Sequence, residues 1–488
     1  MEPAATAATR TDTGTPLSAG VDVAGRPSPG GAGRDLAPDR GTHLSIWGGG
    51  LAGLAVGYYA RKQGLPFTLY EAAERVGGNC RTLEHAGFRF DSGAHRLHHK
   101  RPAVTQEVAQ LLGDALQEIH VPSRLYYEGQ SIDFPLSPLN LLTSLGLRDF
   151  TRTAWEVLSA RLRNQEAGRD FESFALNTYG GTIARRFLLN YSEKLWGIPC
   201  RRLSTEAAVK RLKGLDLRTF LVEAVRGKKA KTEHLDGAFH YPRLGIGTIA
   251  DTLAERCGPE NLRTGAAITR IFHDRTRITG AEINAQSTID VQDVVSTLPL
   301  PQVLAMLEPA PPAEILAVAR TLRFRDVILV ALFLDRESVT DAATVYFPSA
   351  DFPFTRIYEP RNRSRRMSPP GRTSLVAEIP CDETARHDGD QEAELVERVR
   401  SRLIRIGWIR EHEILGVQVA RMKCAYPVRE LETHDQVARI NAFLAGFGNL
   451  RIAGRNGLFQ HAFIHDVIES GAQLMAELTG AMKKGVGR

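Results

Sequence analysis

The sequence predicts a mixed α/β fold in which a nucleotide-binding domain is assembled from separated segments. Near residue 50 a short apolar run, a glycine-rich turn and an amphipathic segment follow one another, which is typical of a βαβ unit. Further short apolar runs, typical of buried strands, recur near positions 70, 268, 295 and 452. A long helical pattern and a strand-rich segment lie between them. We therefore expect a discontinuous Rossmann-like domain, an inserted helical domain and a mixed-sheet domain.

The same patterns set the expected domain boundaries. The nucleotide-binding domain takes residues 43–100, 238–300 and 440–482, the helical domain takes 139–235, and the sheet-containing substrate domain takes 101–138 and 301–439. Residues 1–42 are mainly Ala, Thr, Gly and Pro with scattered charges, and they lack an apolar run. We expect them to form a disordered tail and not a secretory signal.

Composition and charge exclude several classes of protein. Of the 488 residues, 43% are hydrophobic and 24% charged, and the formal net charge of +6 is spread along the chain. The densest basic run, residues 361–366, is typical of a solvated loop, so nucleic-acid binding is not expected. The five scattered cysteines have no C-x-x-C spacing, which favours a cytoplasmic protein without a bound metal. No apolar stretch approaches the length of a membrane span.

The glycine-rich turn carries the first site prediction. Gly48, Gly50 and Gly53 have the G-x-G-x-x-G spacing, and Glu71 ends the next apolar run. Such glycines allow a tight turn, close approach of backbone N–H groups to a pyrophosphate, and close helix packing, while the acid accepts ribose hydroxyls. The motif alone also occurs in simple glycine-rich turns, but strand, helix and acid in this order favour a dinucleotide site. The predicted nucleotide-binding residues of this unit are Gly48, Gly50, Leu51, Ala52, Gly53, Glu71 and Ala72.

A second glycine pair follows the acid. Gly77 and Gly78 can expose backbone N–H groups to another face of the pyrophosphate, and Arg81 can neutralise its charge. Large two-domain flavoproteins carry this extension and simple NAD dehydrogenases lack it, so FAD is favoured over NAD. The remaining predicted cofactor-binding residues are Arg75, Gly77, Gly78, Asn79, Arg81, Gly93, Ala94, His95, Ile268, Gly454 and Arg455.

Two runs are more specific than the nucleotide motif: Tyr-Ser-Glu-Lys-Leu-Trp-Gly at residues 191–197 and Phe-Thr-Arg-Ile-Tyr-Glu at residues 354–359. With them the chain resembles, over about residues 46–477, the flavoproteins that include UDP-galactopyranose mutase and the protoporphyrinogen and amine oxidases. The resemblance implies that His95 lies against the flavin, Trp196 beside a nucleotide sugar, and Arg356 on its diphosphate. It implies catalytic roles for His95 and Arg356, and substrate binding by Trp196, Lys210, Arg211, Arg356 and Tyr426.

The resemblance leaves two reactions open for a small-molecule substrate. One is conversion of a nucleotide-linked pyranose to a furanose through N5 of the reduced flavin. The other is net oxidation of a C–H or C–N bond by FAD. The second is favoured where the chain departs from the mutases, with Leu215 replacing an arginine and Ala425 replacing a tyrosine. Simpler structural roles also stay open: Trp196 as core packing, and Arg356 paired with Glu359 on a surface strand.

Overall fold

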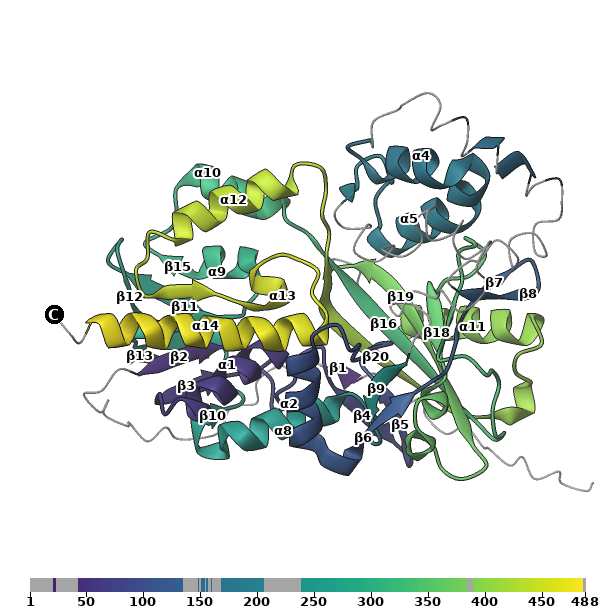
Figure 1. Ribbon diagram of the computed structural model, residues 1–488, viewed down its shortest axis with the longest axis horizontal. Helices are drawn as coiled ribbons and strands as arrows, with labels where there is room; N and C mark the ends of the chain where they lie inside the picture. The colour runs from purple at the N-terminus through teal and green to yellow at the C-terminus, as the bar shows by residue number, and fades with distance from the viewer. Residues whose placement is uncertain are drawn as a thin grey trace, which may run out of the picture.

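The computed structural model describes residues 21–22, 43–134, 168–205, 238–383 and 389–485, together with 148, 151–153, 155, 156 and 159. The described chain is a mixed α/β structure with parallel and antiparallel sheets (Figure 1). Apart from residues 21–22, the predicted disordered tail lies outside the described residues, as do Lys210, Arg211 and Leu215. Within the described parts of the chain, no helix has the length and apolar character to cross a membrane.

A five-stranded parallel sheet is assembled from segments far apart in the sequence. Its order is β10 (Leu262–Arg263), β3 (Phe67–Tyr70), β2 (Leu44–Trp47), β14 (Asp293–Ser296) and β21 (Leu450–Ile452). The strands predicted near positions 45, 70, 295 and 452 are therefore confirmed as members of one sheet.

The strand predicted near position 268 is confirmed, but it is not a member of this sheet. Ile268 begins β11 (Ile268–His273), which belongs to a separate sheet with β12 (Ile278–Ile283), β13 (Ser287–Asp290) and β15 (Leu307–Glu308). The fifth parallel strand is β10, which is only two residues long. Two residues carry no readable hydrophobic period, whereas β11 is six residues long and rich in β-branched and aromatic residues, which are typical of a strand.

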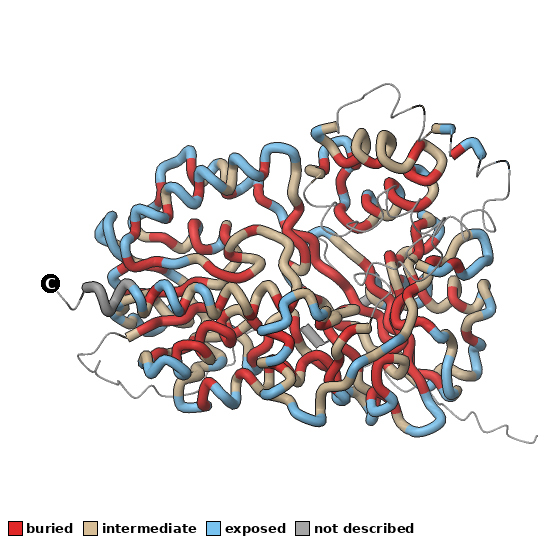
Figure 2. Tube along the Cα trace, viewed as in Figure 1, coloured by how far each residue is buried: buried red, intermediate tan, exposed pale blue. Residues whose placement is uncertain are grey.

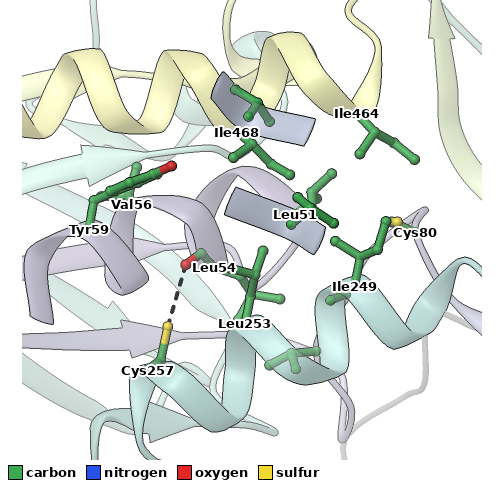
Figure 3. Close-up of a cluster of buried hydrophobic side chains, with 14 of the residues drawn as sticks. Leu51, Leu54, Val56, Tyr59, Cys80, Ile249, Leu253, Cys257, Ile464 and Ile468 are labelled. Carbon is green, nitrogen blue, oxygen red and sulfur yellow. Dashed lines mark hydrogen bonds between the residues drawn. The ribbon is translucent and has the colours of Figure 1, made fainter. Parts of the chain in front are cut away.

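Three helices pack around the first βαβ unit. α1 (Leu51–Lys62) follows β2, and α8 (Gly247–Cys257) and α14 (Ile464–Gly485) pack against it. Figure 3 shows Leu51 and Leu54 of α1 meeting side chains of both partner helices, and the Cys257 thiol donates to the Leu54 carbonyl at 3.4 Å. The predicted crossover helix is confirmed, and its apolar face lies in this core.

A larger, mostly antiparallel sheet lies beside the parallel one (Figure 1). All eleven residues of β16 (Phe324–Leu334) are buried, and from residue 327 to its end the strand is wholly apolar, as a strand covered on both faces requires (Figure 2). Two short strand-like runs flank Glu-Gly-Gln at residues 128–130, a pattern typical of a hairpin, and the structure has this hairpin around Gly129. The strand order is β1 (Val21–Asp22), β20 (Ile414–Pro427), β16 (Phe324–Leu334), β19 (Thr373–Asp382), β18 (Arg356–Tyr358), β17 (Thr344–Tyr346), β7 (Ser123–Tyr127) and β8 (Gln130–Phe134).

The remaining elements surround these sheets. Helices α4 (Phe171–Ile183) and α5 (Asn190–Trp196) are joined by the π-helical turn η2 (Ala184–Leu189) and fall within the predicted helical insertion. The other elements include β4 (Thr82–His85), β5 (Phe88–Asp91), α2 (Pro102–Leu112), β6 (Leu116–Ile119), β9 (Phe239–Pro242), η5 (Pro360–Asn362), η6 (Arg365–Met367), α11 (Gly389–Arg405), α12 (Thr433–Leu444) and α13 (Gly454–Gly457).

Candidate functional site

A cavity of about 1060 Å³ is lined by residues of both the parallel sheet region and the large antiparallel sheet. Its walls include the turn that begins α1, the loop after β5, strand β18, the end of β20 and the segment from α13 into α14. The site therefore draws on segments from residue 48 to residue 467.

The glycine turn between β2 and α1 forms one end of this cavity. Gly48, Gly50, Leu51 and Ala52 line it, and Gly48 has a φ of +97° that favours glycine. A Cβ on Gly53 would lie 1.9 Å from the Gly48 carbonyl oxygen, so Gly53 does not face the cavity but lets the helix pack close to the strand. The first turn of α1 has backbone N–H groups without helical partners, which suits a phosphate.

The second glycine turn is joined directly to the first. The Gly77 N–H donates to the Gly49 carbonyl at 2.8 Å, and Gly50 and Gly77 form a parallel bridge. A Cβ on Gly78 would lie 3.0 Å from the Gly50 α-carbon, so this approach requires glycine. Asn79 also lines the cavity. The two turns therefore bring their backbone N–H groups to the same end of the cavity, where they can bind a pyrophosphate.

Glu71 lies at the end of β3 and also lines the cavity. Its carboxylate accepts hydrogen bonds from the N–H groups of Gly49 at 2.6 Å and Ala73 at 2.9 Å. These bonds fix the side chain and leave acceptor capacity for a ribose hydroxyl. The two glycine turns, residues 48–53 and 77–78, together form what we call the glycine cradle. This cradle and the fixed acid fit the adenosine diphosphate part of FAD.

Several predicted cofactor residues do not line the cavity. Arg81 donates from Nε to the Val76 carbonyl at 3.1 Å and from Nη2 to the Arg75 carbonyl, so its guanidinium holds its own loop together. Arg75 instead pairs with Asp251 at 3.0 Å. Ala72, Gly93 and Ile268 are also absent from the lining. Sequence spacing put these residues near the site but did not give the direction of their side chains.

The loop after β5 brings Ala94 and His95 into the cavity. Burial, followed by the positive charges of Arg356, Arg455 and Arg363, lowers the pKa of His95 to about 3. The imidazole is therefore neutral at physiological pH. Its buried Nε2 has no hydrogen-bond partner among the described residues and is available to a ligand.

Arg356 lines the cavity from β18 and is held by two neighbours. Its Nε donates to Glu378 at 2.6 Å, and its Nη2 donates to the Tyr426 hydroxyl at 3.1 Å. Burial by itself would lower the pKa of Arg356, but Glu378 and the neighbouring tyrosines raise it well above its usual value. The guanidinium is therefore permanently charged. The alternative pairing with Glu359 is wrong, because Glu359 accepts from Thr373 and two backbone N–H groups elsewhere.

Glu378 is the main residue that the sequence analysis missed. Its Oε1 accepts from the Ala94 N–H at 2.6 Å while Oε2 accepts from Arg356, so one buried carboxylate joins the histidine loop to the arginine. Glu378 lies opposite Arg356 in the pairing of β18 with β19. No sequence motif marks it, although a lone acid inside an apolar strand was a usable signal.

Trp196 does not line the cavity but packs edge-on against Tyr426, with the ring centroids 6.0 Å apart. It is almost fully buried, as its alternative role in core packing requires. Tyr426 does line the cavity, and the Arg455 guanidinium carbon lies 4.9 Å from its ring centroid. Gly454 and Arg455 complete this wall from α13, and the Arg455 side chain donates to the Ala425 carbonyl.

Two further sets of lining residues were not predicted. An apolar and aromatic wall is formed by Leu125, Phe134, Phe187, Leu188, Tyr191 and Tyr346. A basic and aromatic part of the wall is formed by two segments, with His98 and Lys100 from one and His461, Phe463 and His465 from the other. His461 precedes α14, and among the described residues no group of three potential ligands is placed to hold a metal ion.

Comparison with known proteins gives the family of this chain. The chain matches the family of flavin-containing amine oxidoreductases over residues 51–474. Protoporphyrinogen oxidase 2 (chloroplastic/mitochondrial) of Arabidopsis thaliana is 30% identical over 157 residues, which are 29% of this chain and 30% of that protein. Coproporphyrinogen III oxidase of Bacillus subtilis (strain 168) is 21% identical over 378 residues, or 69% of this chain and 77% of that protein.

The fold itself is shared with solved structures. A crystal structure of reduced UDP-galactopyranose mutase has a TM-score of 0.80 and 19% identity, covering 90% of this chain and 96% of that one. At this identity the likeness shows the fold alone. The family match covers most of the chain and includes the glycine cradle from Leu51 onward. The chain therefore belongs to the flavin-containing amine oxidoreductases and is an FAD-dependent flavoenzyme.

Proposed function

We propose that this enzyme converts a nucleotide-linked pyranose to the corresponding furanose, without net oxidation. The observation that carries the proposal is Arg356, a buried and permanently charged guanidinium on the cavity wall. Its Nη1 has no hydrogen-bond partner among the described residues, since Nε and Nη2 are taken by Glu378 and Tyr426. A planar cation held in this way suits one face of a diphosphate.

The chain's own residues would act mainly on the departing nucleoside diphosphate. Arg356 binds its negative charge, and Glu378 keeps the guanidinium in place. Tyr191, Tyr346 and Tyr426 bring hydroxyl-bearing rings to the same cavity. Neutral His95 adds no charge to the cavity and offers Nε2 for one hydrogen bond. The reduced flavin, when bound, supplies the nucleophilic N5 that this chemistry needs.

The test is nucleotide binding and turnover by the Arg356→Ala variant and its parent. We expect the dithionite-reduced parent holoenzyme to convert a UDP, TDP or GDP pyranose, with products separated by HPLC. Removing a buried cation from a diphosphate should weaken binding by about 100-fold or more. The control is Arg398→Ala, since Arg398 is exposed on α11 and carries the same charge. A parent that leaves all these sugars unchanged and binds none contradicts the proposal.

The second candidate is net oxidation, and the apolar wall favours it. Leu125, Phe134, Phe187 and Leu188 line the cavity and suit a hydrophobic substrate better than a sugar. Trp196 lies outside the lining, so it is not available there for stacking on a nucleotide base. Oxygen uptake or dye reduction with a hydrophobic amine or porphyrinogen, without prior reduction of the flavin, would favour oxidation over the mutase reaction.

A further inference from the structure

A second cavity, of about 550 Å³, is lined by five arginines. Four come from the basic run predicted to be a solvated loop: Arg361, Arg363, Arg365 and Arg366. The fifth, Arg243, follows β9. The solvated-loop prediction is wrong for the centre of this run, because Arg363 and Ser364 are buried. The chain gathers these charges from two segments that lie more than a hundred residues apart.

The backbone around this cavity is fixed by side-chain hydrogen bonds. Gln117 donates to the Arg363 carbonyl at 2.9 Å, and Ser364 donates to the Arg243 carbonyl at 2.7 Å. The Asn362 side chain donates to the carbonyls of Thr340 and Ala342. The arginines therefore project from a backbone tied at several points, and such preorganisation favours a binding site over a mobile basic loop.

Two of the five arginines that line this cavity have a carboxylate within 4 Å, and the other three have none among the described residues. Arg361 pairs with Glu337 at 2.6 Å, and Arg363 lies 3.9 Å from Asp91. Arg243, Arg365 and Arg366 make no side-chain ion pair or hydrogen bond with the residues that the structure describes. These three exposed guanidinium groups carry like charges that repel one another, and a bound anion would offset that repulsion.

Arg363 distinguishes this cavity from an ordinary basic surface. It is fully buried, and its Nε has no hydrogen-bond partner among the described residues. Its Nη1 donates to the His95 carbonyl at 3.1 Å, and its Nη2 donates to Ala343 and Thr344. One arginine thus lines the second cavity and holds the backbone of a residue that lines the first.

We propose that this second cavity is a binding site for a phosphate-bearing anion, separate from the flavin and substrate cavity. Guanidinium groups bind phosphate oxygens in pairs, and several such groups around one cavity suit a multiply charged anion. The volume exceeds what a single phosphate group needs, so pyrophosphate or a small phosphorylated metabolite fits the chemistry. The anion interacts with Arg243, Arg365 and Arg366, whose charges are not otherwise paired.

The test is calorimetric titration of the holoenzyme with inorganic pyrophosphate at constant ionic strength. We expect one anion per chain to bind independently of Arg356, with at least a tenfold loss of this affinity in the Arg243→Ala/Arg366→Ala double variant. Arg243 and Arg366 are exposed, and the Arg398→Ala/Arg439→Ala variant removes the same charge from equally exposed positions on α11 and α12 outside the cavity, so it should bind as the parent does. Arg356→Ala separates the two cavities, because it alters the first cavity and leaves the second intact.

Each remaining outcome decides for or against the site. Absence of binding, equal affinity in all variants, or loss only in Arg356→Ala would overturn the proposal. Equal binding of citrate would overturn the preference for phosphate. Sedimentation with phosphatidic acid vesicles, lost in the Arg243→Ala/Arg366→Ala variant, would assign the phosphate to a lipid headgroup, whereas pyrophosphate binding without sedimentation assigns a free anion. Circular dichroism of each variant confirms that it is folded.

Discussion

Nε of Arg356 donates a 2.6 Å hydrogen bond to the Glu378 carboxylate, and the two residues face each other across neighbouring antiparallel strands. The same carboxylate accepts from the Ala94 N–H. The charge on the cavity wall and the position of the histidine loop therefore depend on a single buried acid, whose side chain is 3% exposed.

Replacing that acid should disturb both stability and binding. Glu378→Gln leaves a buried guanidinium without its counter-charge, which should lower the free energy of unfolding by about 3–5 kcal/mol. Nucleotide affinity should fall in the same variant because Arg356 is no longer held. Denaturant unfolding and calorimetric titration measure the two effects. Glu397→Gln removes an exposed partner of Arg400 and should cost about 0.5 kcal/mol or less. Equal costs for the two variants would contradict this account.

The close packing at Gly53 predicts that a side chain there reduces cofactor binding. A second glycine in a helix serves as the control for the effect of the substitution on helix propensity. In Gly53→Ala the new Cβ would lie 1.9 Å from the Gly48 carbonyl oxygen, so the turn and the start of α1 must move apart. We expect purified protein with much less bound flavin, measured by absorbance after release of the cofactor. Gly480→Ala in α14 meets nothing within 4 Å and should keep full flavin content. A Gly53→Ala variant with normal flavin content would show that the close packing is not required.

His95 predicts a specific loss of stability in acid. Burial, followed by nearby arginine charges, lowers its pKa from 6.5 to about 3, so the folded protein binds fewer protons than the unfolded chain between these values. Stability that is present at neutral pH is therefore lost as the pH falls through this window. From pH 7 to pH 5 the loss from His95 is about 2 kcal/mol. Denaturant unfolding of His95→Gln should show a decline smaller by that amount, whereas exposed His412→Gln should decline as the parent does.

Lys194 holds a loop of the cavity wall in place, so its replacement should affect substrate binding. Its Nζ donates to the carbonyls of Phe347, Ser349 and Phe352 at 2.7, 2.8 and 3.2 Å, and this loop carries the lining residue Pro348. In Lys194→Met three carbonyls lose their donor, which should cost about 2–4 kcal/mol of stability. We also expect KM for substrate to rise more than kcat falls. Lys62→Met, at an exposed pair with Glu107, should change neither kinetic constant.

Local features of the fold and site could be read from the sequence because they depend on neighbours in the chain. The turn from β2 into α1, the acid ending β3 and the hairpin around Gly129 each follow from local spacing and turn chemistry. By contrast, β10 is too short to show a period, and its place in the sheet is decided by pairing with β3. The local pattern of β11 indicates a strand but does not indicate which sheet that strand joins.

The parts of the site that were missed depend on pairing between distant strands. Glu378 meets Arg356 only because β18 and β19 pair in one register. Trp196 has the same sequence context whether it faces the cavity or packs behind Tyr426, and the fold puts it behind. The position of Arg81 in the sequence was compatible with phosphate binding. Its long side chain instead donates to carbonyls of its own loop, which the sequence does not indicate. Side-chain direction at these positions is a tertiary property.

The interleaved order of the parallel sheet has a consequence for biosynthesis. β14 pairs with β2 on one side and with β21 on the other. The sheet is therefore incomplete until the strand that begins at Leu450 has been synthesised. On the ribosome, β2 and β3 leave the tunnel long before their last partner has been translated. Until then an edge of β14 is open to wrong partners, and contacts between such distant segments form slowly. Early termination upstream of β21 should therefore yield aggregating chains rather than a smaller flavoprotein.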